Sequence, residues 1–202
     1  MNYRLSSLFN EKKAAQVAAF FLLKAEKRRA NISLLKLMKL MYLSERKSYE
    51  LYAEPMIGDR LVCMPHGPVL SNTLNLINFG AKKKVKGGWD ELIADKQDRY
   101  IDLNPQTLIK SADDLRELSE SDLEILESIW ASYGKESAQT LRNLTHTKEV
   151  CPEWEDPDGS SIPISFDKLF DALGFSKEES EFHIAQIHQR AFVASAFSEP
   201  KQ

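Results

Sequence analysis

The 202-residue sequence has little of the residue types that cross-link small secreted proteins or interrupt regular structure. It contains two cysteines, Cys63 and Cys151, together with eight glycines and eight prolines. Two cysteines so far apart make no disulfide framework, which fits a reducing cytoplasm. The low glycine and proline contents exclude collagen-like and low-complexity chains. Apolar residues make up 43% and charged residues 28% of the chain, which is typical of a folded globular protein.

The sequence also lacks a long hydrophobic run. Its longest uninterrupted apolar stretch is Val17–Leu23, far short of the roughly 20 residues that a membrane-spanning helix needs. Lysines and arginines flank this stretch, and no small-residue cleavage site follows it, so a secretory signal is not predicted. We therefore expect a cytoplasmic protein without a membrane partner.

The net charge of −3 conceals an uneven distribution of charge. Residues 1–100 carry 18 lysines and arginines against 10 acidic residues, whereas residues 101–202 carry 9 against 20. A basic half can bind nucleic acid or an acidic protein, and an acidic half can bind a partner of its own. The two halves can equally attract each other within one compact fold, and the sequence alone leaves these interpretations open.

Helical periodicity dominates the sequence. Apolar residues recur at helical spacing over residues 11–28, behind a cap at Asn10, and over residues 33–52, behind a cap at Ser33. The same reasoning predicts a helix over 69–79 with Pro68 in its first turn, a helix from Ser119 with a capping box at Ser121–Glu124, and helices over 137–144, 166–173 and 176–197.

Strand patterns are few. Residues 89–94 and 99–103 read as a β-hairpin, and residues 56–64 form a short strand or a packed loop before Pro65 and Pro68 interrupt regular structure. The predicted fold class is mainly α, a compact helical domain of six or seven helices with a small antiparallel β-hairpin. We expect a single domain over residues 1–202.

Patterns for catalysis, metals and cofactors are largely missing. Of the four histidines, His183 and His188 would lie about 140° apart on a helix, so they do not form a two-ligand face. No glycine-rich phosphate loop is present. We predict no catalytic residue, no metal site and no cofactor. One enzymatic alternative remains, a hydrolase using Cys63 and His66 as a thiol–imidazole pair, although a cysteine in an apolar stretch is typically a buried small residue.

Two segments carry a more specific signal. The first reads Lys36-Leu37-Met38-Lys39-Leu40-Met41-Tyr42, and the second, beyond Pro55-Met56, reads Met64-Pro65-His66-Gly67-Pro68-Val69-Leu70-Ser71. In order, spacing and residue type they resemble the Panacea, or SocA-like, antitoxin family, which shows a K-L-x-K-L-x-Y pattern followed by a GPV element. Residues 141–146, followed by acidic residues and Trp154, extend the resemblance.

The resemblance implies a binding protein and not an enzyme. Members of this family, which includes phage-associated proteins, neutralise unrelated toxins by direct contact, and one delivers its toxin to a protease. The expected partners are therefore a cognate toxin and, by analogy, a protease; nucleic acid is not an expected partner. The partner-binding residues that we predict are Lys36, Lys39, Tyr42, His66, Gly67 and Pro68. A prophage-associated protein that binds another partner or nucleic acid is the alternative, beside the Cys/His hydrolase.

Overall fold

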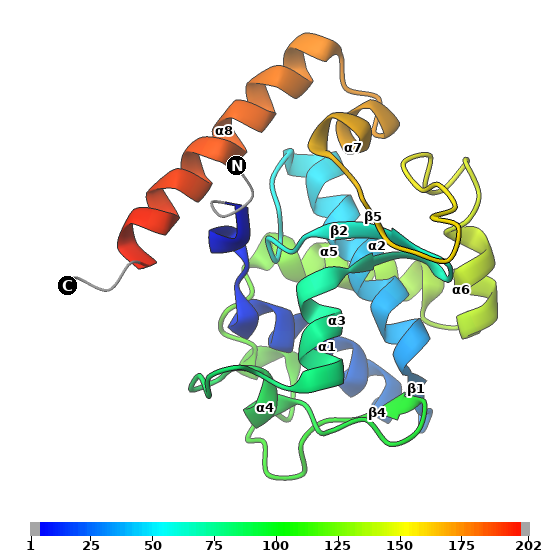
Figure 1. The fold of residues 1–202 in the computed structure, drawn as a ribbon. Helices are drawn as coiled ribbons and strands as arrows, with labels where there is room; N and C mark the ends of the chain where they lie inside the picture. Colours follow the sequence, from blue (N-terminus) through cyan, green and yellow to red (C-terminus); the bar gives the residue numbers. More distant parts are fainter. Residues whose placement is uncertain (1–4, 199–202) are drawn as a thin grey trace.

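The computed structural model describes residues 5–198 and is mainly helical, which confirms the predicted fold class (Figure 1). The helices are the 3-10 helices η1 (Leu5–Leu8) and η2 (Ala112–Asp114) and the α-helices α1 (Glu11–Lys27), α2 (Leu34–Tyr52), α3 (Ser71–Phe79), α4 (Trp89–Leu92), α5 (Glu120–Tyr133), α6 (Ala138–Leu144), α7 (Phe166–Ala172) and α8 (Lys177–Ser198). The strands are β1 (Ile32–Ser33), β2 (Leu61–Met64), β3 (Gly67–Leu70), β4 (Tyr100–Ile101) and β5 (Ile162–Pro163). The ends of the predicted single domain, residues 1–4 and 199–202, lie outside the described residues.

Helix α1 is a core helix of the fold. Asn10 caps it by accepting a hydrogen bond from the Lys13 backbone N–H at 3.0 Å. Every side chain from Ala14 to Leu23 is buried, and the helix contacts α2, α4 and α5. Because alanines occupy much of this stretch, the surrounding helices can approach closely, so the apolar run read from the sequence is a core helix.

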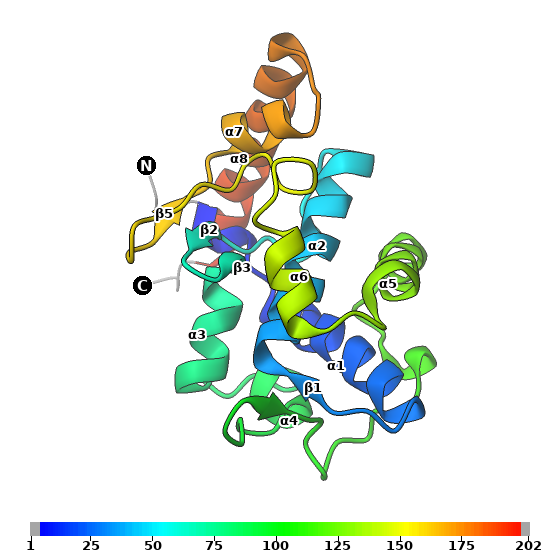
Figure 2. The ribbon, with the colours of Figure 1, turned by 90° about the vertical axis from the view of Figure 1, so that its right-hand side faces the viewer.

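Helix α2 carries the first family-like segment and packs on α1, α5 and α6, which lie around it in Figure 2. Its start is fixed by the Ser33 cap and by the antiparallel pairing of β1 with β4, in which Ile32 faces Ile101. Because α5 also contacts α1, the helices α1, α2 and α5 pack on one another.

A three-stranded antiparallel sheet of order β3-β2-β5 carries the second family-like segment. Strands β2 and β3 form a hairpin in which Met64 pairs with Gly67, so Pro65 and His66 make a two-residue turn. This corrects the predicted position of Pro68, which lies in strand β3 and not in a helix; α3 begins at Ser71. A proline is tolerated there because β3 is an edge strand of the sheet.

The hairpin predicted over residues 89–103 is only partly present. Trp89–Leu92 forms the short helix α4, and the return of the chain is paired through isolated bridges such as Ile93 with Leu103. The Trp89 side chain is buried, and its backbone N–H donates to Glu11 Oε1 at 3.1 Å, so tertiary contacts favour the helical turn over a strand. The predicted capping box also lies two residues earlier, between Ser119 and Asp122.

The uneven charge distribution is matched by ion pairs between the two halves of the chain. Lys13 pairs with Asp122 at 2.7 Å, Lys24 pairs with Glu127, and Arg46 pairs with Glu153 at 2.9 Å. Mutual attraction of the halves within one fold therefore accounts for part of the asymmetry. Within residues 5–198, no helix is long and apolar enough to cross a membrane.

Candidate partner-binding surface

The two family-like segments meet where Lys39 of α2 reaches the backbone of the hairpin. Lys39 is fully buried, and its Nζ donates to the Pro68 carbonyl at 2.7 Å. Gly67 has a φ of +92°, and a Cβ placed on it would lie 2.6 Å from Lys39 Nζ and 2.8 Å from Thr145 Oγ1. Only glycine fits this position without displacing those groups. The structure thus brings Lys39, Gly67 and Pro68 together.

Burial also changes the acid–base behaviour of this lysine. Removal from water lowers the pKa of Lys39 to about 7, an effect that nearby Arg142 reinforces. Near neutral pH the Lys39 ammonium group consequently loses its proton easily. The hydrogen bond to the Pro68 carbonyl orients the Nζ atom.

One turn further along α2, Tyr42 belongs to a second buried cluster. Its hydroxyl donates to Glu153 Oε1 at 2.6 Å, and Arg46 Nε donates to the same oxygen at 2.9 Å. Tyr42 and Glu153 are both fully buried. Burial and the adjacent Glu153 carboxylate raise the pKa of Tyr42 well above its ordinary value, so its hydroxyl stays a donor. This cluster ties the loop after α6 to α2.

Lys36 lies apart from this cluster, near the start of α2. Its Nζ donates to the Gly134 carbonyl at 2.9 Å, beyond the end of α5, and lies 5.9 Å from the centre of the Trp130 ring. Burial, followed by the charge of Arg28, lowers the pKa of Lys36. Lys36 is half-buried and holds α2 against α5, so the six predicted residues do not form one contiguous surface.

The exposed part of the predicted site is the tip of the hairpin. Pro65 and His66 are exposed, and His66 interacts electrostatically with His146, just beyond α6. The His146 ring packs against Trp154, with ring centroids 4.2 Å apart. Arg142 Nε and His146 Nε2 are enclosed and have no hydrogen-bond partner among the described residues. We call Pro65, His66, Arg142, His146 and Trp154 the turn surface.

Burial and the positive charges of Arg142 and Lys39 lower the pKa of His146. The turn surface therefore combines aromatic rings with the permanent positive charge of the partly exposed Arg142. Such a surface is suited to an acidic group on another protein, which would be attracted by the Arg142 charge.

The cysteines lie in environments that disfavour a nucleophilic thiolate. Cys63 and Cys151 are both free and buried. The Cys63 thiol donates to the Glu153 carbonyl at 3.9 Å and accepts from the Glu155 N–H at 3.5 Å, and burial raises its pKa. Burial and the Glu153 charge raise the pKa of Cys151 to about 12. No group of three possible metal ligands occurs within the described part of the chain.

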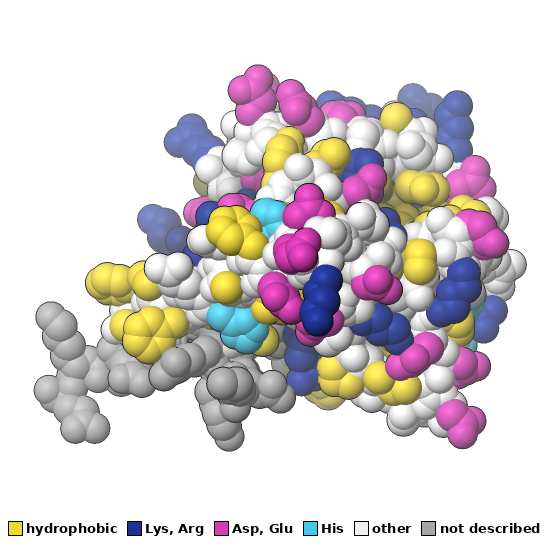
Figure 3. All heavy atoms as spheres, turned by 90° about the horizontal axis from the view of Figure 1, so that it is seen from above, with side chains coloured by type: hydrophobic (Ala, Val, Ile, Leu, Met, Phe, Trp, Pro, Cys, Tyr) yellow, Lys and Arg dark blue, Asp and Glu magenta, His cyan; other side chains and the backbone are white. Residues whose placement is uncertain are grey.

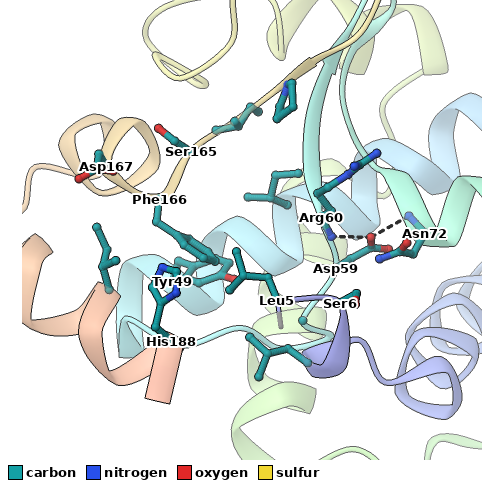
Figure 4. A pocket seen from close by; sticks show the side chains of 16 residues that line it. Leu5, Ser6, Tyr49, Asp59, Arg60, Asn72, Ser165, Phe166, Asp167 and His188 are labelled. Atoms are coloured by element: carbon teal, nitrogen blue, oxygen red, sulfur yellow. Dashed lines mark hydrogen bonds between the residues drawn. The ribbon is translucent and has the colours of Figure 1, made fainter. Parts of the chain in front are cut away.

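A cavity of about 480 Å³ lies on another part of the molecule, between η1, the start of β2, and helices α7 and α8 (Figure 4). Tyr49, Phe166 and His188 form one wall. At the opposite end, the Asp59 carboxylate accepts from the backbone N–H groups of Asn72 and Thr73, both at 2.8 Å. These bonds cap α3, so the carboxylate is engaged in the fold.

Several residues that build the site escaped sequence reasoning. Glu153 anchors Tyr42 and Arg46, Thr145 closes around Gly67, and Glu45 accepts from the backbone N–H groups of Ile57 and Gly58. All three are polar residues that are fully buried. Their partners are distant in sequence, or lie in a loop without periodicity, so no local pattern indicated these contacts.

The part of the chain that carries most of the motif residues matches a known protein family. The family model described as "Antitoxin SocA-like, Panacea domain" matches residues 37–155, more than half of the chain. The chain belongs to this family. The matched segment contains Lys39, the β2–β3 hairpin, α6 and Trp154, which are the elements that meet around the hairpin. Among curated proteins and among solved structures, no match was found.

Proposed function

We propose that this Panacea-domain protein acts as an antitoxin, a cytoplasmic protein that neutralises a partner toxin by direct protein–protein contact. The observation that carries the proposal is the family match over residues 37–155. That segment encompasses the buried motif residues and the turn surface that they support.

Within this proposal the six predicted residues have different roles. Lys39, Gly67 and Pro68 are buried and act on a partner indirectly, by fixing the conformation of the hairpin. Tyr42 is also buried, and it acts by holding the loop after α6 through Glu153. His66 is exposed at the turn and contacts the toxin itself. Lys36 contributes by holding α2 against α5.

The turn surface supplies the direct contacts in this account. Arg142 offers the charge of a partly exposed side chain, and Trp154 offers a partly exposed aromatic ring that packs against His146. An acidic side chain of the toxin would satisfy Arg142, and the charge attraction would help to orient the two proteins as they meet. Arginine and tryptophan are also residue types that often dominate binding energy at interfaces.

The proposed role is non-catalytic. Both thiols are buried with raised pKa values, which argues against the Cys63–His66 hydrolase. Several of the basic residues of the first half pair with acidic residues of the second half, which argues against a nucleic-acid surface. Delivery of the bound toxin to a protease would be a further step built on the same contact.

Growth rescue tests the proposal. The product of the adjacent gene, expressed alone, is expected to arrest growth, and co-expression of the wild-type protein is expected to restore it. The double variant His66→Ala/Arg142→Ala should fail to restore growth while accumulating normally. Lys83→Ala/Lys84→Ala, which removes two exposed charges elsewhere, is the matched control and should restore growth. Rescue by the first pair equal to that by the control would place the contact elsewhere.

A further inference from the structure

Helix α8 is attached to the rest of the protein along one narrow face. Ser180, Ile187 and Ala191 are its buried residues, and the helix packs on η1 and α7. In Figure 1 it runs diagonally along one side of the molecule, with much of its length projecting from the body. Most of the circumference of this 22-residue helix therefore faces away from the core.

The opposite face of α8 is uncharged between residues 182 and 197 and carries four large apolar side chains. At 100° per residue, one arc about 140° wide collects eight positions from four turns. These are Phe182, Ala185, Gln186, Gln189, Phe192, Val193, Ala196 and Phe197, all of them exposed. We call these eight residues the α8 seam. Phe182 is 60% exposed and Phe197 is 86% exposed.

Charged residues between 182 and 197 avoid the seam. Arg190 lies at its border and pairs with Glu54 at 2.5 Å, which directs its charge toward the body. Figure 3 shows apolar side chains on the projecting part of the molecule that contains α8. A helix that is apolar on both its inner and its outer face is typical of one that packs on two sides.

The spacing of the seam indicates what packs on it. Its central positions are Phe182, Ala185, Gln189, Phe192 and Ala196, which alternate by three and four residues as in helices that pair with each other. We propose that the seam binds the α8 seam of a second copy of this chain, giving a reversible two-fold dimer.

The charges of α8 select the orientation of this pair. Glu178, Glu179 and Glu181 cluster in the first turns of the helix, and the one acidic residue of the sequence after them is Glu199. A parallel pair would bring the two acidic clusters together. An antiparallel pair separates them and also opposes the two helix dipoles, so the dimer is antiparallel.

The size of the seam indicates how tightly the two copies should bind each other. The seam residues span four turns, about 24 Å of helix, and exposed phenylalanines contribute most of the area. Two seams together bury roughly 1,000 Å², the lower limit for a specific interface. We therefore expect a dimer that dissociates in the micromolar range.

This dimer would not block the turn surface. Helix α8 lies on the other side of the molecule from α6, which carries Arg142 (Figure 1). A dimer can therefore bind toxin at both ends, and failure of the dimer leaves the proposed antitoxin function intact.

Sedimentation velocity of the purified full chain, without toxin, tests the proposal. Between about 1 and 300 μM, a range that brackets a micromolar dissociation constant, the wild-type mass should rise from 23.0 kDa toward twice that value. Phe182→Glu/Phe197→Glu should stay monomeric throughout, because it places carboxylates in the seam. The control Phe79→Glu/Leu108→Glu alters two side chains of equal or greater exposure (82% and 90%) elsewhere and should dimerise like the wild type.

Far-UV circular dichroism and growth rescue complete the design. Both variants should keep the wild-type helical signal and should still restore growth in the presence of toxin. A wild-type protein that remains monomeric at the highest concentration would overturn the proposal. Dimerisation of the seam variant equal to that of the wild type, or equal loss of the dimer in the control, would also overturn it.

Discussion

Replacement of Gly67 by alanine tests the assembly of the family motif most sharply. The methyl group would be added at a φ of +92° and would point at Lys39 Nζ and Thr145 Oγ1, 2.6 and 2.8 Å away. Lys39 is the flexible partner, but it can withdraw only by giving up its bond to the Pro68 carbonyl inside the core. The substitution therefore combines backbone strain with loss of a buried hydrogen bond.

The expected cost follows from these two terms. An alanine with positive φ costs about 1–2 kcal/mol. Loss of the buried hydrogen bond from Lys39, which is only partly protonated near neutral pH, costs about 1–3 kcal/mol. Allowing for partial relaxation, we expect Gly67→Ala to lower the free energy of unfolding by about 3 kcal/mol, which lowers the Tm by roughly 6–12 °C in a protein of this size.

Gly159 offers a matched control for this substitution. It has a φ of +78°, and nothing lies within 4 Å of the position that its Cβ would take. Gly159→Ala therefore carries the backbone strain alone, about 1–2 kcal/mol. Urea unfolding followed by circular dichroism would compare the two variants with the wild type. Equal losses of stability in both would refute a steric role for the Lys39–Thr145 enclosure.

Three further predictions concern buried groups. Burial raises the pKa of Glu45 from 4.5 to about 7, so between these pH values the folded state binds more protons than the unfolded state. The free energy of unfolding of the wild type should therefore fall as the pH rises through this range. Glu45→Gln should flatten this part of the pH dependence, measured by urea unfolding. Glu153→Ala removes the nearest carboxylate from the largely buried Arg46 and should cost about 3 kcal/mol, whereas Tyr42→Phe should cost about 1–2 kcal/mol in the same assay. Cys63 and Cys151 should react with a thiol reagent only at the rate of unfolding; rapid labelling of the folded protein would contradict their burial.

The helices could be predicted from the sequence because their determinants are local. Asn10 and Ser33 cap the helices that they were expected to cap, and the apolar periodicity of α1 and α2 marks their buried faces. The hairpin over residues 61–70 was not predicted, because Pro65 and Pro68 normally interrupt strands. Pro68 is accommodated at the sheet edge, where its carbonyl accepts from Lys39.

The site could be predicted only in part. The family-like segments located the residues that meet, but polar side chains in a helix usually face solvent, which suggested that Lys39 and Tyr42 were surface contacts. Their burial depends on Pro68 and Glu153, which lie 29 and 111 residues further along the chain. The arrangement of such partners is a property of the folded chain, and no spacing within α2 encodes it.

The affinity of the purified protein for the product of the adjacent gene, measured by calorimetry, tests the central claim most directly. Wild type should bind, and His66→Ala/Arg142→Ala should weaken binding by at least about 2 kcal/mol, roughly thirtyfold in Kd, with an unchanged Tm. The control Lys83→Ala/Lys84→Ala should bind within about twofold of wild type, as expected for exposed charges outside an interface. Wild-type binding that the turn-surface substitutions leave unchanged would contradict the account, as would the absence of binding by the wild-type protein.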